Sequence, residues 1–126
     1  MNKKRIVLVV DDEHSVMETT VAFLENVRVF QVIGTSSFEC AATHLAAPGC
    51  IDVLVCDYRL WRARSGLELC EIAVALNAAV AIVLISAESS DEAKSRPQRA
   101  IFLRKPFGRV ELLHGIKAAT LRTKDV

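Results

Sequence analysis

Apolar residues gather in five short runs along the chain, and the stretches between them have apolar positions at helical spacing. The runs lie at residues 5–10, 29–34, 51–56, 79–85 and 100–103. The first, RIVLVV, is unbroken rather than alternating, as expected for a strand that is covered on both faces. We therefore predict five strands in the interior of the molecule.

The stretches between the runs predict four helices, at residues 13–25, 37–46, 66–76 and 107–121. Either Ser36 or Ser37 is placed to cap the second helix. Ser65 and Glu68 have the spacing of a capping box at the start of the third helix. These signals indicate where the helices begin.

Strands that alternate with helices predict an α/β fold, in which parallel strands are joined by crossover helices. The weak point is the segment 88–98, whose only apolar residue is Ala93 and in which Pro97 would interrupt a helix. We expect one or two loose turns there in place of a well-packed helix.

The composition describes one ordinary globular domain of 126 residues, 52% of them hydrophobic. The 16 Lys and Arg residues nearly balance the 15 Asp and Glu residues, which argues against a dedicated nucleic-acid-binding protein. No apolar run is long enough to span a membrane, and the first run ends at once in two aspartates. We therefore expect neither a secretory signal nor a membrane segment, and a location in the cytoplasm.

The four cysteines show no pattern of a redox or zinc site. Cys40, Cys50, Cys56 and Cys70 form no CxxC pair and have no His at zinc-finger spacing. We expect free thiols that are buried or half-buried, because free Cys behaves as a small hydrophobe.

Charged and hydroxyl side chains follow the predicted strands at the edge where parallel sheets bind ligands. These residues are Asp11, Asp12 and Glu13 after the first strand, Asp57 after the third, Ser86 after the fourth, and Lys105 and Pro106 after the fifth. Clustered carboxylates repel one another unless a cation neutralises them, and ligands that are all oxygen suit Mg²⁺. A lysine and a hydroxyl beside that ion would complete a cradle for a phosphoryl group. Each residue alone fits a turn or a helix cap better, but their joint placement favours a site.

Four segments in this order resemble the response regulator receiver domain of two-component signalling. They are VLVVDDE at 7–13, VLVCDYRL at 53–60, LISA at 84–87 and FLRKPF at 102–107. The resemblance covers about residues 4–121 and leaves short tails at 1–3 and 122–126. It implies a three-layer (βα)5 fold of the flavodoxin-like kind, with a doubly wound sheet of five parallel strands.

The resemblance implies a phosphoacceptor and a metal site. Asp57 would be phosphorylated. Mg²⁺, or Mn²⁺ as a substitute, would be held by Asp11, Asp12, Asp57 and the backbone carbonyl of Arg59.

The resemblance also implies a switch. Ser86 and Lys105 would bind phosphoryl oxygens, Phe102 would rotate on activation, and the peptide bond before Pro106 would be cis. The phosphodonor would be a histidine kinase or a histidine phosphotransfer protein, and the output protein is unknown. No direct contact with nucleic acid or membrane is implied, and no enzymatic activity beyond self-phosphorylation and slow self-dephosphorylation.

The loop after Asp57, DYRLWRARSGLEL, is most similar to receivers of hybrid sensor histidine kinases. It is one residue longer than usual and has Trp61 where the family usually has proline. Trp61, Arg62 and Arg64 are either part of a variable surface loop or a patch that contacts a partner, since Trp and Arg are favoured at interfaces.

Two further departures concern the mouth of the site and the fourth helix. Arg59 and Glu88 are expected to face each other, either as an ion pair that shields the phosphoryl group or as two solvated charges. The segment between Ser86 and Phe102 is short and polar, so we expect a shortened fourth helix and a monomer or a weak dimer.

Two other functions are weighed against a phosphoacceptor receiver. One is an interaction scaffold that has the fold but works without phosphorylation. The other is a small α/β phosphatase with Asp57 as nucleophile, but such enzymes carry a second acid where this chain has Arg59.

Overall fold

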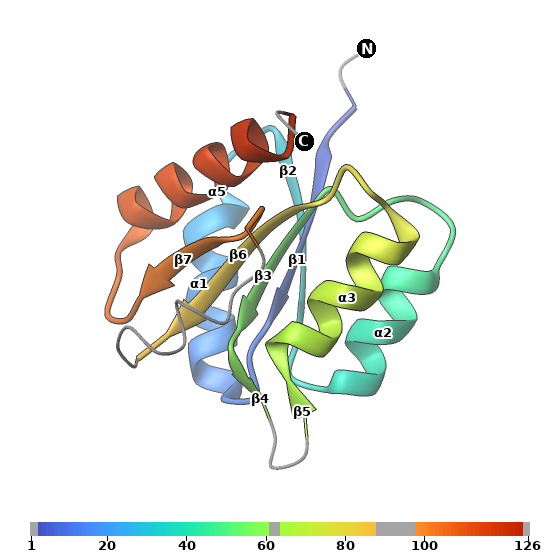
Figure 1. Cartoon of the computed structure of the whole chain (residues 1–126). Coiled ribbons are helices and arrows are strands. Elements are labelled where there is room, and N and C mark those ends of the chain that lie inside the picture. Colours follow the sequence, from blue (N-terminus) through green and yellow to red (C-terminus); the bar gives the residue numbers. More distant parts are fainter. Residues whose placement is uncertain (1–2, 61–63, 88–97, 125–126) are drawn as a thin grey trace.

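Five parallel strands form one central sheet in the order β2-β1-β3-β6-β7 (Figure 1). The strands are β1 (Arg5–Val10), β2 (Phe30–Thr35), β3 (Val53–Asp57), β6 (Ala81–Ser86) and β7 (Ile101–Arg104). The structure is a computed structural model that describes residues 3–60, 64–87 and 98–124. The predicted parallel α/β architecture is confirmed.

Two helices of the described part of the chain cover each face of the sheet (Figure 1). The helices are α1 (His14–Glu25), α2 (Phe38–Ala46), α3 (Gly66–Leu76) and α5 (Arg109–Lys124). Leu24 of α1 and Leu112 of α5 pack in one hydrophobic core, while Leu45 of α2 and Leu69 of α3 pack in the other. None of the helices in the described ranges has the length and apolar character needed to cross a membrane.

The alternation of side chains along β1 explains why one strand serves both cores. Val7 and Val9 point into the core under α1 and α5, whereas Leu8 and Val10 point into the core under α2 and α3. Because helices cover both faces of the sheet, β1 has no solvent-facing side on which polar residues could alternate with apolar ones. The strand is therefore an unbroken apolar run.

The strand order reverses between β1 and β3, at the centre of the sheet. The chain runs from β1 outward to β2, and then crosses to the other side of β1 to form β3. In doubly wound sheets, ligands bind outside the carboxyl ends of the strands at this reversal point. Asp11 follows β1 directly and Asp57 is the last residue of β3.

Four strands begin and end later than the sequence pattern predicts. The second is 30–35 in place of 29–34 and the fifth is 101–104 in place of 100–103. The difference is larger for the third, which is 53–57 in place of 51–56, and at the start of the fourth, which is 81–86 in place of 79–85. Ile51 and Val80 are buried outside the strands, so burial alone made them look like strand residues. Asp57 and Ser86 join the sheet although they are polar.

The loop after Asp57 contains a small antiparallel hairpin of β4 (Arg59–Leu60) and β5 (Arg64–Ser65). Leu60 is buried in the hydrophobic core, which fixes the first strand of this hairpin. The side chains of the predicted partner patch, Trp61, Arg62 and Arg64, lie outside the part that the structure describes.

The predicted N-cap position of Ser65 at α3 is confirmed, but the predicted capping hydrogen bond of its side chain is wrong. Ser65 is at the N-cap with an extended backbone, but its side chain makes no capping hydrogen bond. The first amide of the helix, that of Gly66, is instead satisfied by the carbonyl of Tyr58 at 2.8 Å.

Two predictions about the remaining chain have different outcomes. The loose turns and the shortened fourth helix fall mainly on residues 88–97, which lie outside the described residues. All four cysteines are free, and Cys56 and Cys70 are buried as expected. Cys40 and Cys50 are exposed, contrary to expectation, because one lies on the outer side of α2 and the other in the connection before β3.

The structure selects Ser37 over Ser36 as the cap of α2, since the Ser37 Oγ accepts the Cys40 amide at 3.2 Å. We predict that Ser37→Ala lowers the free energy of unfolding by about 1 kcal/mol. The matched variant Ser36→Ala should change it by less than about 0.5 kcal/mol. Urea unfolding followed by circular dichroism measures both, and an equal loss in the two variants would contradict the assignment.

Candidate functional site

Three carboxylates meet at the ends of β1 and β3. Asp11, Asp12 and Asp57 each offer one oxygen, and these oxygens all lie within 4.8 Å of one another. Asp11 is 4% exposed and Asp57 is 8% exposed, while Asp12 is open to solvent. The parallel topology thus brings together side chains that are 45 residues apart in the chain, as the sequence predicts.

Backbone amides orient the two buried carboxylates. The amide of Glu13 donates to Asp11 Oδ1 at 2.9 Å, where the chain turns from β1 into α1. The amide of Arg59 donates to Asp57 Oδ1 at 3.0 Å, at the start of the hairpin. In both residues one oxygen is held by the local backbone, and the other can face the centre of the site.

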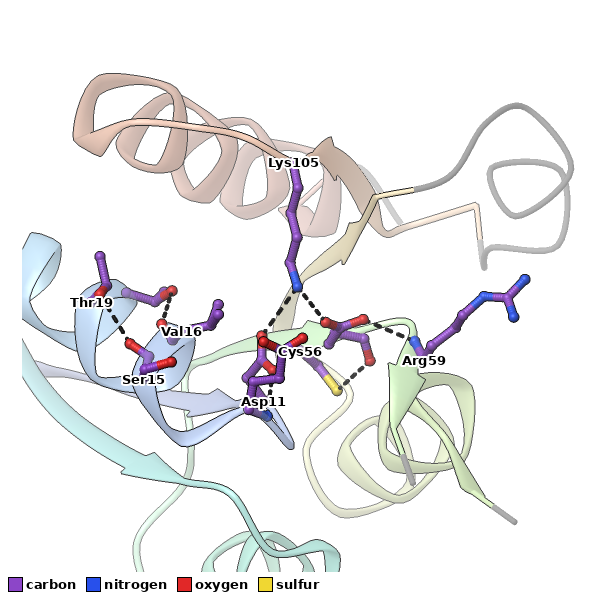
Figure 2. Close-up of polar contacts among 10 residues, drawn as sticks. Asp11, Ser15, Val16, Thr19, Cys56, Arg59 and Lys105 are labelled. Carbon is purple, nitrogen blue, oxygen red and sulfur yellow. Dashed lines mark hydrogen bonds and ion pairs between the residues drawn. The ribbon is translucent and has the colours of Figure 1, made fainter. Parts of the chain in front are cut away.

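Lys105 provides the positive charge in this cluster (Figure 2). Its Nζ lies 2.7 Å from Asp57 Oδ2 and 3.5 Å from Asp11 Oδ2. The Lys105 amide donates to the Ser86 carbonyl at 2.9 Å, and the Lys105–Pro106 peptide bond is cis, as expected. Partial burial opposes the charge on Lys105, but the hydrogen bond to Asp57 and the attraction of both carboxylates outweigh it. The pKa of Lys105 is therefore raised above 10.5.

The negative charge of Asp11 is unfavourable where it lies, although Lys105 is nearby. Burial raises the pKa of Asp11 to about 6, and the charge of Asp57 adds to the increase. The Glu13 amide and Lys105 oppose this shift without cancelling it. Three carboxylates and one ammonium leave an excess of negative charge, and all the side-chain donors are hard oxygens. This donor set fits a divalent cation such as Mg²⁺.

The other predicted residues lie around this centre. Ser86 is 2% exposed at the end of β6, next to Arg104 in the register with β7. Phe102 pairs with Leu84 and is half-buried against the core that contains α3. Arg59 is exposed at the edge of the site, but its predicted partner Glu88 lies outside the described residues.

The sequence pattern missed the contact between Gly66 and the end of β3. A Cβ at Gly66 would lie 2.3 Å from the carbonyl oxygen of Asp57. The sequence contains one indication of this contact. Gly66 belongs to the predicted helix, where a glycine is unfavourable unless close packing requires it.

A family model for the response regulator receiver domain matches residues 7–117 of this chain. Similar solved structures include a response regulator receiver protein from Sinorhizobium medicae, at 26% identity and a TM-score of 0.83. That match covers 94% of this chain and 97% of the other. No curated protein matches this chain.

Two further solved structures share the fold. One is a response regulator receiver domain protein from Clostridium thermocellum, at 22% identity and a TM-score of 0.78, covering 95% of this chain and 97% of the other. The other is the chemotaxis response regulator CheY4 of Vibrio cholerae, at 22% identity and a TM-score of 0.75, covering 93% of this chain and 99% of the other.

The raised pKa of Asp11 makes a prediction about stability. Because folding raises this pKa from 3.8 to about 6, ionising Asp11 costs free energy in the folded state. The stability of the metal-free protein should therefore fall as the pH rises from about 4 to about 6. We expect Asp11→Asn to raise the free energy of unfolding by about 1–3 kcal/mol at pH 7, and by much less near pH 4.

Urea unfolding in the presence of EDTA at both pH values measures this effect. Asparagine keeps an acceptor for the Glu13 amide, so the comparison isolates the charge of Asp11. A variant that is less stable than the wild type at pH 7 would contradict the assignment.

Proposed function

Because this chain belongs to the response regulator receiver domain family, we propose that Asp57 accepts a phosphoryl group from a phosphohistidine. The donor would be a histidine kinase or a histidine phosphotransfer protein of a two-component or phosphorelay pathway. The observation that carries the proposal is the arrangement of the Asp57 carboxylate. One of its oxygens is held by the Arg59 amide, and the other faces Lys105 beside two further carboxylates.

The chemistry of phosphoryl transfer requires this kind of surrounding. An oxygen of Asp57 attacks phosphorus, the bond from phosphorus to the donor nitrogen breaks, and its electron pair stays on the imidazole of the donor. Both the carboxylate and the phosphoryl group are anionic, so the catalytic contribution is mainly positioning and charge neutralisation. The ammonium group of Lys105 lies 2.7 Å from Asp57 Oδ2. After transfer, it would bind the phosphoryl oxygens instead.

A divalent cation fits the remaining negative charge. We assign Mg²⁺, with Mn²⁺ as a substitute, to Asp11, Asp12, Asp57 and the backbone carbonyl of Arg59. When bound, the ion supplies positive charge that offsets the repulsion between the carboxylate and the incoming phosphoryl group. Asp11 and Asp12 then serve as its ligands, and the Arg59 amide keeps Asp57 oriented.

Phosphorylation would act as a switch through Ser86 and Phe102. The buried Ser86 hydroxyl would move to a phosphoryl oxygen, and the half-buried Phe102 ring would enter the space that this movement leaves. A local change of charge would thus bias a two-state surface that an output protein reads. We also propose that Arg59 and Glu88 form an ion pair that limits the access of water to the aspartyl phosphate. The proposed location of the module is the cytoplasm.

Phosphorylation of Asp57 is testable with acetyl phosphate. We expect the wild type to gain one phosphoryl group by intact-mass spectrometry when Mg²⁺ is present, and none with EDTA. Asp57→Asn should gain none, because the amide is not a nucleophile for phosphorus. Asp52→Asn is the matched control: Asp52 accepts the Ile6 amide at 2.8 Å, away from the site, and this variant should be phosphorylated like the wild type.

Two outcomes would contradict the proposal. A phosphoryl group on Asp57→Asn would place the acceptor elsewhere. An unmodified wild type that also fails to bind Mg²⁺ in calorimetry would favour a scaffold that works without phosphorylation.

A further inference from the structure

The first residue of α3, Gly66, rests directly on the backbone of the phosphoacceptor. A Cβ at this position would lie 2.3 Å from the carbonyl oxygen of Asp57 and 3.1 Å from its carbonyl carbon. Ordinary contacts between carbon and a carbonyl oxygen are about 3.3 Å or longer. The obstacles are backbone atoms at the end of a fully buried strand, which cannot rotate away as a side chain can.

The need for glycine here comes from contact and not from backbone conformation. Gly49 is the glycine with a positive φ among the described residues, and Gly66 is not in that region. The Cβ would also meet Cys56 Sγ at 3.2 Å, so both residues at the end of β3 line the space under the helix. Any side chain at position 66 has to push α3 and β3 apart.

Hydrogen bonds connect this contact to the Asp57 carboxylate. The Gly66 amide donates to the Tyr58 carbonyl at 2.8 Å, and the Tyr58 amide donates to the Ile85 carbonyl of β6, also at 2.8 Å. The next amide, that of Arg59, donates to Asp57 Oδ1 at 3.0 Å. The Tyr58–Arg59 peptide, which orients the carboxylate, is thus held by the first amide of α3, and the peptide before it is held by β6.

The β4–β5 hairpin is a second connection between the two ends of the segment from Asp57 to Gly66. Arg59 pairs with Ser65, and Leu60 pairs with Arg64. Leu60 is 3% exposed and belongs to the core that includes Leu69 of α3. Figure 1 shows β4 and β5 extending from the ends of β3 and α3, so the chain leaves Asp57 and returns to it at Gly66.

We infer that Gly66 is a positioning residue for Asp57. Because Gly66 has no side chain, the first turn of α3 can contact the Asp57 carbonyl. This contact and the β4–β5 hairpin together hold the Arg59 amide in line with Asp57 Oδ1. The inference rests on the proposed function where phosphorylation is the readout. It extends that function because Gly66 touches neither a phosphoryl group nor a metal, and acts through the backbone of Asp57.

The size of the expected effect follows from the distance. A methyl group at position 66 requires a shift of about 1 Å to reach an ordinary contact. Misplacing a reacting group by about 1 Å costs on the order of 100-fold in rate. We therefore expect Gly66→Ala to lower the rate constant for phosphorylation by acetyl phosphate by at least about tenfold.

Gly34→Ala is the matched control, because its Cβ would also be crowded, but by side-chain atoms and not by the backbone of β3. It would lie 2.5 Å from Met17 Sδ and 2.6 Å from Val21 Cγ2, which are ends of side chains on α1. This variant should be destabilised and still be phosphorylated within about twofold of the wild-type rate. An equal loss of rate in both variants would show that general destabilisation is the cause, and would overturn the inference.

The Arg59 amide offers a readout that does not depend on phosphorylation. In ¹⁵N-¹H spectra of the unphosphorylated protein, the Arg59 resonance reports the hydrogen bond to Asp57 Oδ1. We expect Gly66→Ala to shift it, and Gly34→Ala to leave it in place. If the wild type were not phosphorylated, the proposed function would fail, while this resonance would still decide whether Gly66 positions Asp57. An unshifted Arg59 resonance in Gly66→Ala would overturn the inference.

A second pair of variants serves if Gly66→Ala does not fold. Leu60→Ala removes the side chain that anchors the hairpin without introducing a clash. Leu45→Ala makes the same change in the same core, on α2. We expect Leu60→Ala to shift the Arg59 resonance and to slow phosphorylation several-fold, and Leu45→Ala to do neither. Wild-type behaviour of Leu60→Ala in both measurements would overturn the inference.

Discussion

Three carboxylates meet at the ends of β1 and β3, where two of them are almost completely buried, and their mutual repulsion must be offset by other groups. Lys105 offsets part of it through its ion pairs with Asp57 and Asp11. The pKa of Asp11 is nevertheless raised, mainly by burial and further by the charge of Asp57. The uncompensated negative charge and the all-oxygen donor set are why a divalent cation fits this cluster.

The fold can hold such a cluster because the strands that carry it are tightly packed on both faces. β3 and β6 are buried along their whole length, between the cores under α1 and α5 on one side and α2 and α3 on the other. A shift of register by one residue would turn every side chain of such a strand into the opposite core and disrupt the packing in both cores. The unfavourable charges therefore sit at the ends of the most constrained elements, where the carboxylates cannot move apart to relieve the repulsion.

The segment from Asp57 to Gly66 leaves the end of β3 and returns to it. Leu60 anchors the β4–β5 hairpin in the core, and Gly66 lies against the Asp57 carbonyl. Within this closed loop, the backbone of Tyr58 and Arg59 has hydrogen-bond partners on both sides.

The sequence by itself determined the parallel α/β fold and the residues at the ligand edge. Burial on both faces requires unbroken apolar strands, and parallel topology places Asp11, Asp57 and Lys105 at one edge whatever the details of packing. The tertiary structure alone decided which oxygen Lys105 contacts most closely, that Ser37 caps α2, and that Gly66 rests on Asp57. Apolar periodicity records whether a position is buried. The Ser37 cap depends on local backbone geometry, and the contacts of Lys105 and Gly66 depend on how closely segments meet that are distant in the chain.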